Sequence, residues 1–186
     1  MTVDLDRELI AALVRTGDAE LFRQLVERYQ ERVFRLVASV LGPYSEADAE
    51  EVTQEVFLRV YRQLKGFRGE STFSTWLYRV AYRRALDRKQ LARHRLPHSS
   101  DAALASVAGA DNPFEQAARA QQSARVAVCM EALPDLYRTM LYLRYWMDCS
   151  VEEIAELIGA PAGTVKSYLA RARQRVEREL EKAGHV

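Results

Sequence analysis

Apolar residues recur at steps of three and four through almost the whole chain, and this spacing constrains the fold more than any other feature. An α-helix turns through about 100° per residue, so side chains three and four positions apart share one face. No segment of useful length alternates apolar and polar residues as a half-buried strand would. The sequence therefore predicts an all-α protein whose helices pack through apolar stripes.

Two breaks in this periodicity divide the predicted helices. A helix over 21–40 is followed by GPYS, where Gly and Pro end it, and a second helix begins near Ser45. Residues 94–113 lose amphipathic order and gather Ser, Ala, Gly, Asp and two prolines, a composition typical of a flexible linker. We therefore expect two small helical domains joined by this linker.

Membrane proteins and disulfide scaffolds are excluded by composition. No apolar run approaches the roughly 18 residues of a membrane span, and the acidic start of the chain is unlike a secretory signal. We expect a cytoplasmic protein with no membrane insertion. Cys129 and Cys149 stand alone in apolar surroundings, so we expect buried thiols rather than metal ligands or a disulfide.

Charge is unevenly distributed, although 27 basic and 26 acidic side chains nearly cancel. Residues 66–96 carry eight Lys or Arg against two Asp or Glu, and residues 164–186 carry six against three. Because salt screens each charge beyond about 10 Å, polyanion binding depends on local charge and not on the total. Both basic stretches therefore suit contact with nucleic acid.

The second predicted helix carries an acidic face. Its core face consists of residues at four-residue steps: Val52, Val56, Val60 and Leu64. Asp48, Glu51 and Glu55 share a different face, the acidic face, where like charges repel one another. Two explanations account for acids on one face. In the first, Ser45 caps the helix, the acids of the first turn complement the helix dipole, and Glu55 forms an ion pair with Arg59. In the second, the acidic face is a docking surface for a basic partner.

Residues 66–95 combine aromatic and basic side chains. Gly66 and Gly69 favour a loop, and Ser71 or Ser74 is expected to cap the helix that follows. Its predicted buried stripe is Phe73, Trp76, Leu77 and Val80. Its predicted outward face is Tyr78, Arg79, Tyr82, Leu86 and Lys89, with Arg83 beside it. Rings that stack on bases and cations that meet phosphates suit single-stranded DNA; an ordinary solvated basic face is the alternative.

Helix-turn-helix signals follow near the C-terminus. Ser150 and Glu153 form a capping box, Gly159 ends that helix, and Pro161 suits the start of another. The second helix is predicted to bury Val165, Leu169, Ala172, Val176 and Leu180. It presents Ser167, Ala170, Arg171, Gln174 and Arg178 outward, flanked by Lys166, Arg173 and Arg175. Such a face can reach base edges in a major groove while the flanking cations meet phosphates; a solvated helix of an ordinary bundle is the alternative.

In this order, the segments resemble the extracytoplasmic-function (ECF) sigma factors of bacterial RNA polymerase. The resemblance spans 17–182 and rests on DAEEVTQEVFLRVYRQL, FRGESTFSTWLYRVAYRRALDR and SVEEIAELIGAPAGTVKSYLARARQRVEREL, with the linker between the second and third. It implies an N-terminal extension over 1–16, a sigma region 2 domain over 17–93, a linker over 94–112 and a region 4 domain over 113–186.

The resemblance also implies a role for each surface. Docking onto the clamp helices of the largest polymerase subunit would involve Asp48, Glu51, Gln54 and Glu55. Capture of the melted non-template strand of the minus-ten element would involve Phe67, Arg68, Ser71, Trp76, Tyr78, Arg79, Tyr82, Arg83 and Lys89. Reading of the minus-thirty-five duplex would involve Thr164, Lys166, Ser167, Tyr168, Ala170, Arg171, Gln174 and Arg175. Its implied partners are promoter DNA, the largest and second-largest subunits of core polymerase, and an anti-sigma factor; no catalytic residue, metal or cofactor is implied, because the polymerase adds the nucleotides.

Two positions depart from the family pattern. Arg83 stands where members usually have Asn, in VAYR instead of I-A-x-N, and Tyr168 stands where members usually have Arg, in GTVKSY instead of GTVKSR. We expect a shifted promoter preference, with Arg171 and Arg175 carrying more of the minus-thirty-five contact.

Two other classes of protein fit parts of the sequence. A helix-turn-helix regulator that works without polymerase would use residues 1–95 as a sensor or dimerisation module and would bind its operator alone. A helical metal enzyme would use the acidic face, but no E-x-x-H pair accompanies it, and Pro97 interrupts any helix that would align His94 with His98.

Overall fold

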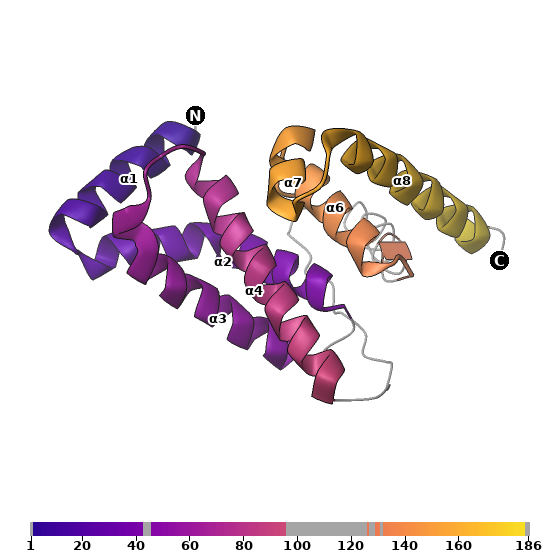
Figure 1. Cartoon of the computed structure of the whole chain (residues 1–186), viewed down its shortest axis with the longest axis horizontal. Helices are drawn as coiled ribbons and strands as arrows, with labels where there is room; N and C mark the ends of the chain where they lie inside the picture. The colour runs from indigo at the N-terminus through magenta and orange to yellow at the C-terminus, as the bar shows by residue number, and fades with distance from the viewer. Residues whose placement is uncertain (1, 43–45, 96–125, 127–128, 131, 185–186) are drawn as a thin grey trace, which may run out of the picture.

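The computed structural model describes residues 2–42, 46–95, 126, 129–130 and 132–184, and those residues contain helices and no strand. The N-terminal half comprises α1 (Thr2–Thr16), α2 (Ala19–Leu41), α3 (Glu46–Gln63), the 3-10 turn η1 (Leu64–Gly66) and α4 (Phe73–Arg95). The C-terminal half comprises α6 (Asp135–Tyr145), α7 (Val151–Ile158) and α8 (Ala162–Gly184) (Figure 1). The all-α prediction is confirmed, while the predicted linker lies outside the described residues except for its first two.

Helix α2 is the centre of the N-terminal half and packs against α1, α3 and α4. Asp18 caps it by accepting a hydrogen bond from the Glu20 amide at 2.8 Å, and Gly42 ends it with a φ of 78°. The predicted core face of α3 is confirmed, since Val52, Val56 and Val60 are fully buried. Periodicity alone was sufficient to predict the core face of α3, because this helix has one apolar stripe and packs through it.

Helix α1 is fastened to α2 by a buried carboxylate. Asp6 accepts hydrogen bonds from the Arg28 guanidinium and the Tyr29 hydroxyl, while Ile10 and Leu13 pack into the shared core. Burial and the bond to Asp6 raise the pKa of Tyr29 far above its usual range. The segment predicted as an N-terminal extension therefore packs as part of the N-terminal half.

The helix-turn-helix forms as its local signals predict. Ser150 Oγ accepts from the Glu153 amide at 3.1 Å, and the Glu153 carboxylate accepts from the Ser150 amide at 2.8 Å, so the capping box is confirmed. Gly159 ends α7 in the left-handed conformation, and Pro161 immediately precedes α8. Burial of Leu180 was wrongly predicted: it is 37% exposed, and the buried residues of α8 lie in its first half.

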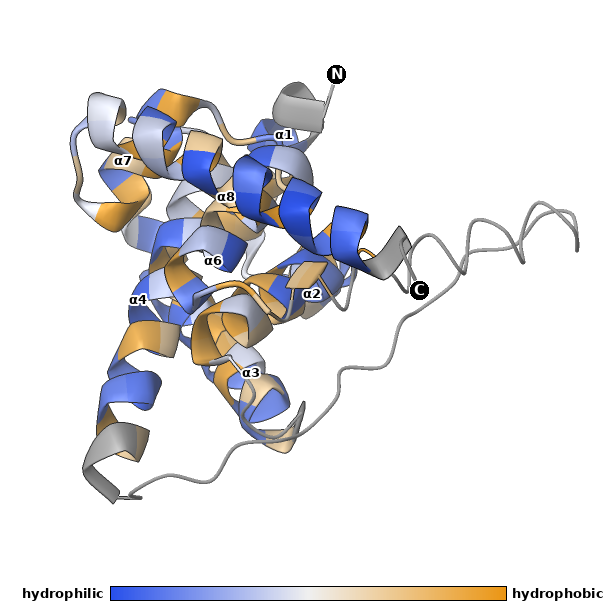
Figure 2. Ribbon diagram, turned by 90° about the vertical axis from the view of Figure 1, so that its right-hand side faces the viewer, coloured by the Kyte–Doolittle hydropathy of each residue, from blue (hydrophilic) through white to orange (hydrophobic). Residues whose placement is uncertain are grey.

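The two halves pack against each other, α6 on α2 and α7 on α4 (Figure 1). Apolar residues of both halves join one core, and hydrophilic residues cover much of the outer surface of α8 (Figure 2). Ser39 donates to Thr139 Oγ1 at 3.3 Å between buried side chains of α2 and α6. At Gly42, whose φ of 78° favours glycine, a Cβ would lie 2.9 Å from Asp135 Oδ1, so a larger residue would require the Asp135 side chain to shift.

The cysteines and the apolar content of the helices were both subjects of prediction. Cys129 and Cys149 are both buried, as predicted. Among the helices that the structure describes, none combines the length and apolar character of a membrane span.

Candidate functional site

The acidic face on α3 is matched by arginines of α4. Arg84 Nη2 lies 2.6 Å from Glu55 Oε2, and Arg88 Nη2 lies 2.5 Å from Glu51 Oε2. Arg88 also lies 3.8 Å from carboxylate oxygens of Asp48 and of Glu55. These cations offset the repulsion among the acids. Glu55 pairs with Arg84, and not with Arg59 as one of the two explanations from sequence had it.

This pairing comes from a helical hairpin. Helices α3 and α4 run in roughly opposite directions, so residues four apart on one helix face residues four apart on the other (Figure 1). Arg84 and Arg88 were not predicted as partners of the acidic face, although their four-residue spacing matches that of Glu51 and Glu55. Glu51 remains 58% exposed at its side chain and Gln54 is exposed, so the acidic face stays accessible to a partner.

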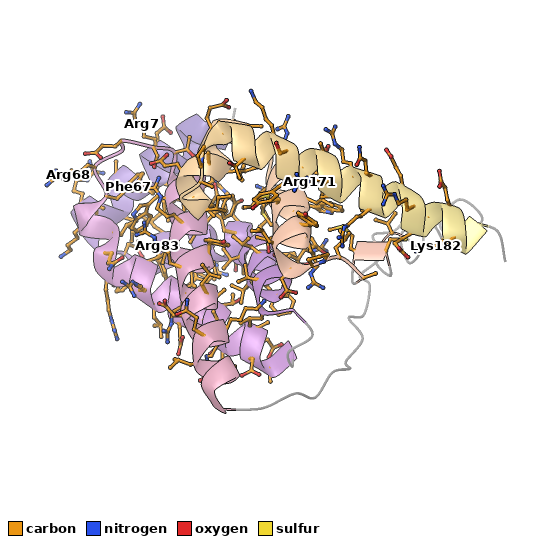
Figure 3. The ribbon with its side chains drawn as sticks, turned by 45° about the vertical axis from the view of Figure 1, so that its right-hand side comes forward. Arg7, Phe67, Arg68, Arg83, Arg171 and Lys182 are labelled. Atoms are coloured by element: carbon orange, nitrogen blue, oxygen red, sulfur yellow. The ribbon has the colours of Figure 1, made fainter. Side chains whose placement is uncertain are left out.

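An aromatic cluster lies where the loop after η1 meets α4. The half-buried ring of Phe67 lies 5.2 Å from that of Trp76 and 6.1 Å from that of Phe73. Thr72 caps α4 by accepting from the Thr75 amide at 3.2 Å, which corrects the expectation that Ser71 or Ser74 does so. Arg68 and Arg83 are exposed, and Ser71 is half-buried. Figure 3 labels Phe67, Arg68 and Arg83, which all lie in the N-terminal half.

The predicted outward face of α4 is wrong at three positions. Tyr78, Tyr82 and Lys89 are only 1%, 8% and 7% exposed. Burial raises the pKa of both tyrosines. Helix α4 is covered by neighbours on more than one side, α2 and α3 on one and α7 on another, which a single helical wheel does not reveal.

Two cations of that face, the half-buried Arg79 and the buried Lys89, have acidic partners in the C-terminal half. Arg79 Nη2 lies 2.5 Å from Glu156 Oε1 of α7, and Thr75 donates to Glu153 Oε1 at 2.6 Å. Lys89 forms an ion pair with Asp135 at the start of α6. Neither α7 acid was recognised from sequence as a contact of α4.

Helix α8 presents most of its predicted duplex-binding residues outward. The exposed ones are Lys166, Ser167, Arg171, Gln174 and Arg175, and the half-buried ones are Thr164, Tyr168 and Ala170. Figure 3 shows Arg171 in the first half of α8 and Lys182 near its end. Tyr168 packs inward, its ring 5.9 Å from that of Tyr137, and Arg175 lies 5.3 Å over the same Tyr137 ring. Stacking on Tyr137 orients Arg175 on this surface.

Comparison with known proteins identifies the family of this chain. The family model described as Sigma-70 region 2 matches residues 25–102, and the one described as Sigma-70, region 4 matches residues 123–176. RNA polymerase sigma-H factor of Pseudomonas aeruginosa is 33% identical over 97% of this chain and 96% of the relative. ECF RNA polymerase sigma-E factor of Escherichia coli K12 is 33% identical over 97% of each. The chain belongs to the ECF sigma factors.

One further relative and two solved structures are similar to this chain. The SigW factor of Bacillus subtilis is 32% identical over 90% of this sigma factor and 92% of its own length. CnrH, solved with the cytosolic domain of CnrY, has a TM-score of 0.66 at 24% identity over 95% of this chain and 97% of that one. The sigma factor RpoE of Bartonella quintana, solved with the anti-sigma factor NepR, also has a TM-score of 0.66. It is 20% identical, and the match covers 86% of this chain and 96% of that one. These two structures share its fold.

Family membership determines what this sigma factor does in outline. It is a regulatory protein that directs bacterial RNA polymerase to promoters at transcription initiation. In the part of the chain that the structure describes, no group of three or more His, Cys, Asp or Glu is placed to hold a metal ion.

Proposed function

We propose that this sigma factor docks onto core polymerase through α3, holds the melted minus-ten strand with the loop before α4 and with α4, and reads the minus-thirty-five duplex with α8. The separation of charge supports this division: acids gather on α3, whereas α8 carries an exposed row of cations and amides. Core binding and DNA binding need opposite surface charges, because DNA is a polyanion. Action on polymerase places the protein in the cytoplasm, and catalysis belongs to the polymerase.

The observation that carries the duplex-reading role is the outward row on α8. Arg171 and Gln174 are exposed side by side on the helix that follows the tight turn at Gly159. In a helix-turn-helix the second helix enters the major groove, where Arg and Gln can pair with base edges. Arg175, oriented by Tyr137, supplies a flanking cation.

An anti-sigma factor is part of the proposal. The two solved proteins with the same fold have partners bound: CnrH has the cytosolic domain of CnrY, and the sigma factor RpoE has the anti-sigma factor NepR. We infer that a protein of this class controls the present chain by covering surfaces that polymerase or promoter DNA would use.

Run-off transcription tests the proposal. Purified chain and core polymerase are incubated with a library of genomic fragments, and transcripts are sequenced to locate their starts. We expect defined starts that depend on the chain, with shared elements near positions minus ten and minus thirty-five. Core polymerase alone is the control, and tight operator binding by the chain without polymerase, with no directed transcription, would favour a conventional regulator instead.

A further inference from the structure

Helix α6 supplies an aromatic ring to the helix proposed to read duplex DNA. Helices α6 and α8 pack against each other, and the half-buried ring of Tyr137 on α6 contacts two side chains of α8. Its centroid lies 5.9 Å from that of the Tyr168 ring and 5.3 Å from the guanidinium carbon of Arg175. Tyr168 and Arg175 are about two turns apart, so they share one face of α8. A residue outside the helix-turn-helix pair α7 and α8 thus contacts two residues of the predicted duplex-reading set.

Arg175 is held by this ring and not by a carboxylate. Among the residues that the structure describes, Arg175 forms no ion pair, and Glu179, one turn further along α8, pairs with Lys182 at 2.8 Å. A cation held over the face of a ring keeps its positive charge, and its N–H donors are not occupied by a carboxylate. Because Arg175 is exposed, those donors are available to an anion that approaches from solvent.

Tyr168 occupies the position where the family pattern usually has Arg. Its side chain is half-buried and packs on the core, with its ring tilted at 56° to that of Tyr137. Tilted aromatic pairs of this kind are favourable beyond the area that they bury. The cation that the family pattern has at this position is absent from this chain, and a ring that packs against Tyr137 stands in its place.

We propose that Tyr137 is a positioning residue for DNA binding: with Tyr168 beside it, it holds Arg175 so that the guanidinium meets a backbone phosphate of the minus-thirty-five duplex. This inference rests on the proposed function of α8. A long side chain loses rotamer freedom when it binds, and one that is already oriented loses less. Tyr137 therefore raises the affinity for the duplex without touching it. Phosphates are common to all sequences, so this gain is equal for every element.

A double-mutant cycle tests the positioning role. Holoenzyme made with each variant is titrated against a fluorescent duplex that carries the minus-thirty-five element of a promoter recovered from the fragment library. Tyr137→Leu should weaken binding about fivefold, within the range of a cation–ring contact, whereas Tyr137→Phe, which keeps the ring, should bind as wild type does. In an Arg175→Ala background, Tyr137→Leu should have no further effect. Tyr145→Leu, which changes an exposed tyrosine of the same helix, is the matched control and should not weaken binding.

A second variant removes the other ring. Tyr168→Leu should weaken binding about twofold, since it loses the ring pair that supports Tyr137. This loss should also disappear in the Arg175→Ala background, because both rings act through Arg175. The Tyr168 variant keeps the cycle decisive if Tyr137→Leu fails to fold, which thermal unfolding of the free chain detects.

Dependence on salt and on sequence identifies the anion that Arg175 meets. Arg175→Ala should weaken binding equally across a set of element variants. It should also reduce the slope of log affinity against log salt by about 0.9, the contribution of one phosphate contact in duplex DNA. Tyr137→Leu should likewise act equally on all element variants.

The outcomes separate this inference from the proposed function. Undiminished binding by Tyr137→Leu, an equal loss with Tyr137→Phe, or a loss that persists in the Arg175→Ala background would each overturn the positioning role. A loss with Arg175→Ala that depends on sequence, or no loss at all, would overturn the phosphate contact while leaving α8 as the reading helix. Wild-type holoenzyme that binds the element no better than an unrelated duplex of equal length would overturn the proposed function of α8, and this inference with it.

Discussion

Arg84 of α4 donates from Nε to Glu55 Oε2 of α3 at 2.7 Å, and Arg88 repeats this pairing with Glu51 one turn along. A helix proposed to bind DNA thus neutralises part of the surface proposed to bind polymerase. Since these carboxylates remain partly exposed, a basic partner can approach them from solvent.

Reversing charge on the acidic face should abolish polymerase docking. We expect the variant Glu51→Lys/Glu55→Lys to lose co-purification with core polymerase. The new lysines would repel a basic partner, and they would also repel Arg84 and Arg88. Circular dichroism should show retained helix content. Glu50→Lys, an exposed change on the same helix, is the control; undiminished co-purification of the double variant would remove α3 from the proposed interface.

Loss of Arg171 should weaken duplex recognition. Arg171→Ala is expected to cost holoenzyme about 1–3 kcal/mol of binding free energy at minus-thirty-five elements, unequally among element sequences if the guanidinium reads a base. Fluorescence anisotropy on a set of element variants measures this. A uniform loss would indicate a phosphate contact, and a loss no greater than that of Arg178→Ala would contradict a specific role.

Removal of Asp6 should loosen α1. Asp6→Ala leaves the Tyr29 hydroxyl and the Arg28 guanidinium without their partner, and we expect the free energy of unfolding to fall by about 1–3 kcal/mol. Urea denaturation measures the change, with the exposed Glu8→Ala as control. Equal stability of the two variants would show that α1 contributes little to the N-terminal half.

The Cys149 thiol should react slowly with alkylating reagents. Burial raises its pKa from a usual 9.0 to about 12, which lowers the thiolate fraction at pH 8 about 1000-fold. Because the folded-state pKa is raised, the stability that this group contributes is present below pH 9 and decreases as pH rises toward 12. Iodoacetamide labelling followed by peptide mapping, with urea-unfolded protein as reference, checks the rate; labelling as fast as in urea would contradict it.

Glu153 should stabilise the protein only while it is ionised. Burial acts to raise its pKa, but hydrogen bonds from Thr75 and Ser150 outweigh burial and lower the pKa from its usual 4.5. Its stabilisation is therefore present above pH 4.5 and lost as pH falls through the lowered value. We expect Glu153→Gln to cost about 1 kcal/mol at pH 7 and progressively less at acid pH.

That dependence can be measured by thermal unfolding across the acid range. Glu152→Gln, in the same first turn of α7 but exposed, serves as the control. If Glu153→Gln were equally destabilising at pH 3 and pH 7, the charge of Glu153 would not be responsible for its contribution.

Local patterns alone determined the core face of α3 and both ends of α7. The apolar spacing of α3, the capping box at Ser150 and the left-handed Gly159 involve residues within a few positions of one another, so the sequence displays them directly. The same holds for the exposed row around Arg171, which follows from helical geometry. The family resemblance added the roles of the surfaces, and the match to known ECF sigma factors confirmed the family.

Only the tertiary structure decided which faces of α4 are covered. Helical spacing predicted Tyr78 and Lys89 outward, but α4 packs on several neighbours at once, and one helical wheel cannot represent that. The contacts that decide it join residues far apart in sequence: Arg79 meets Glu156, 77 positions on, and Ser39 meets Thr139, 100 positions on. Such pairs depend on how whole helices pack, because side chains so distant in sequence come together only when the domains do.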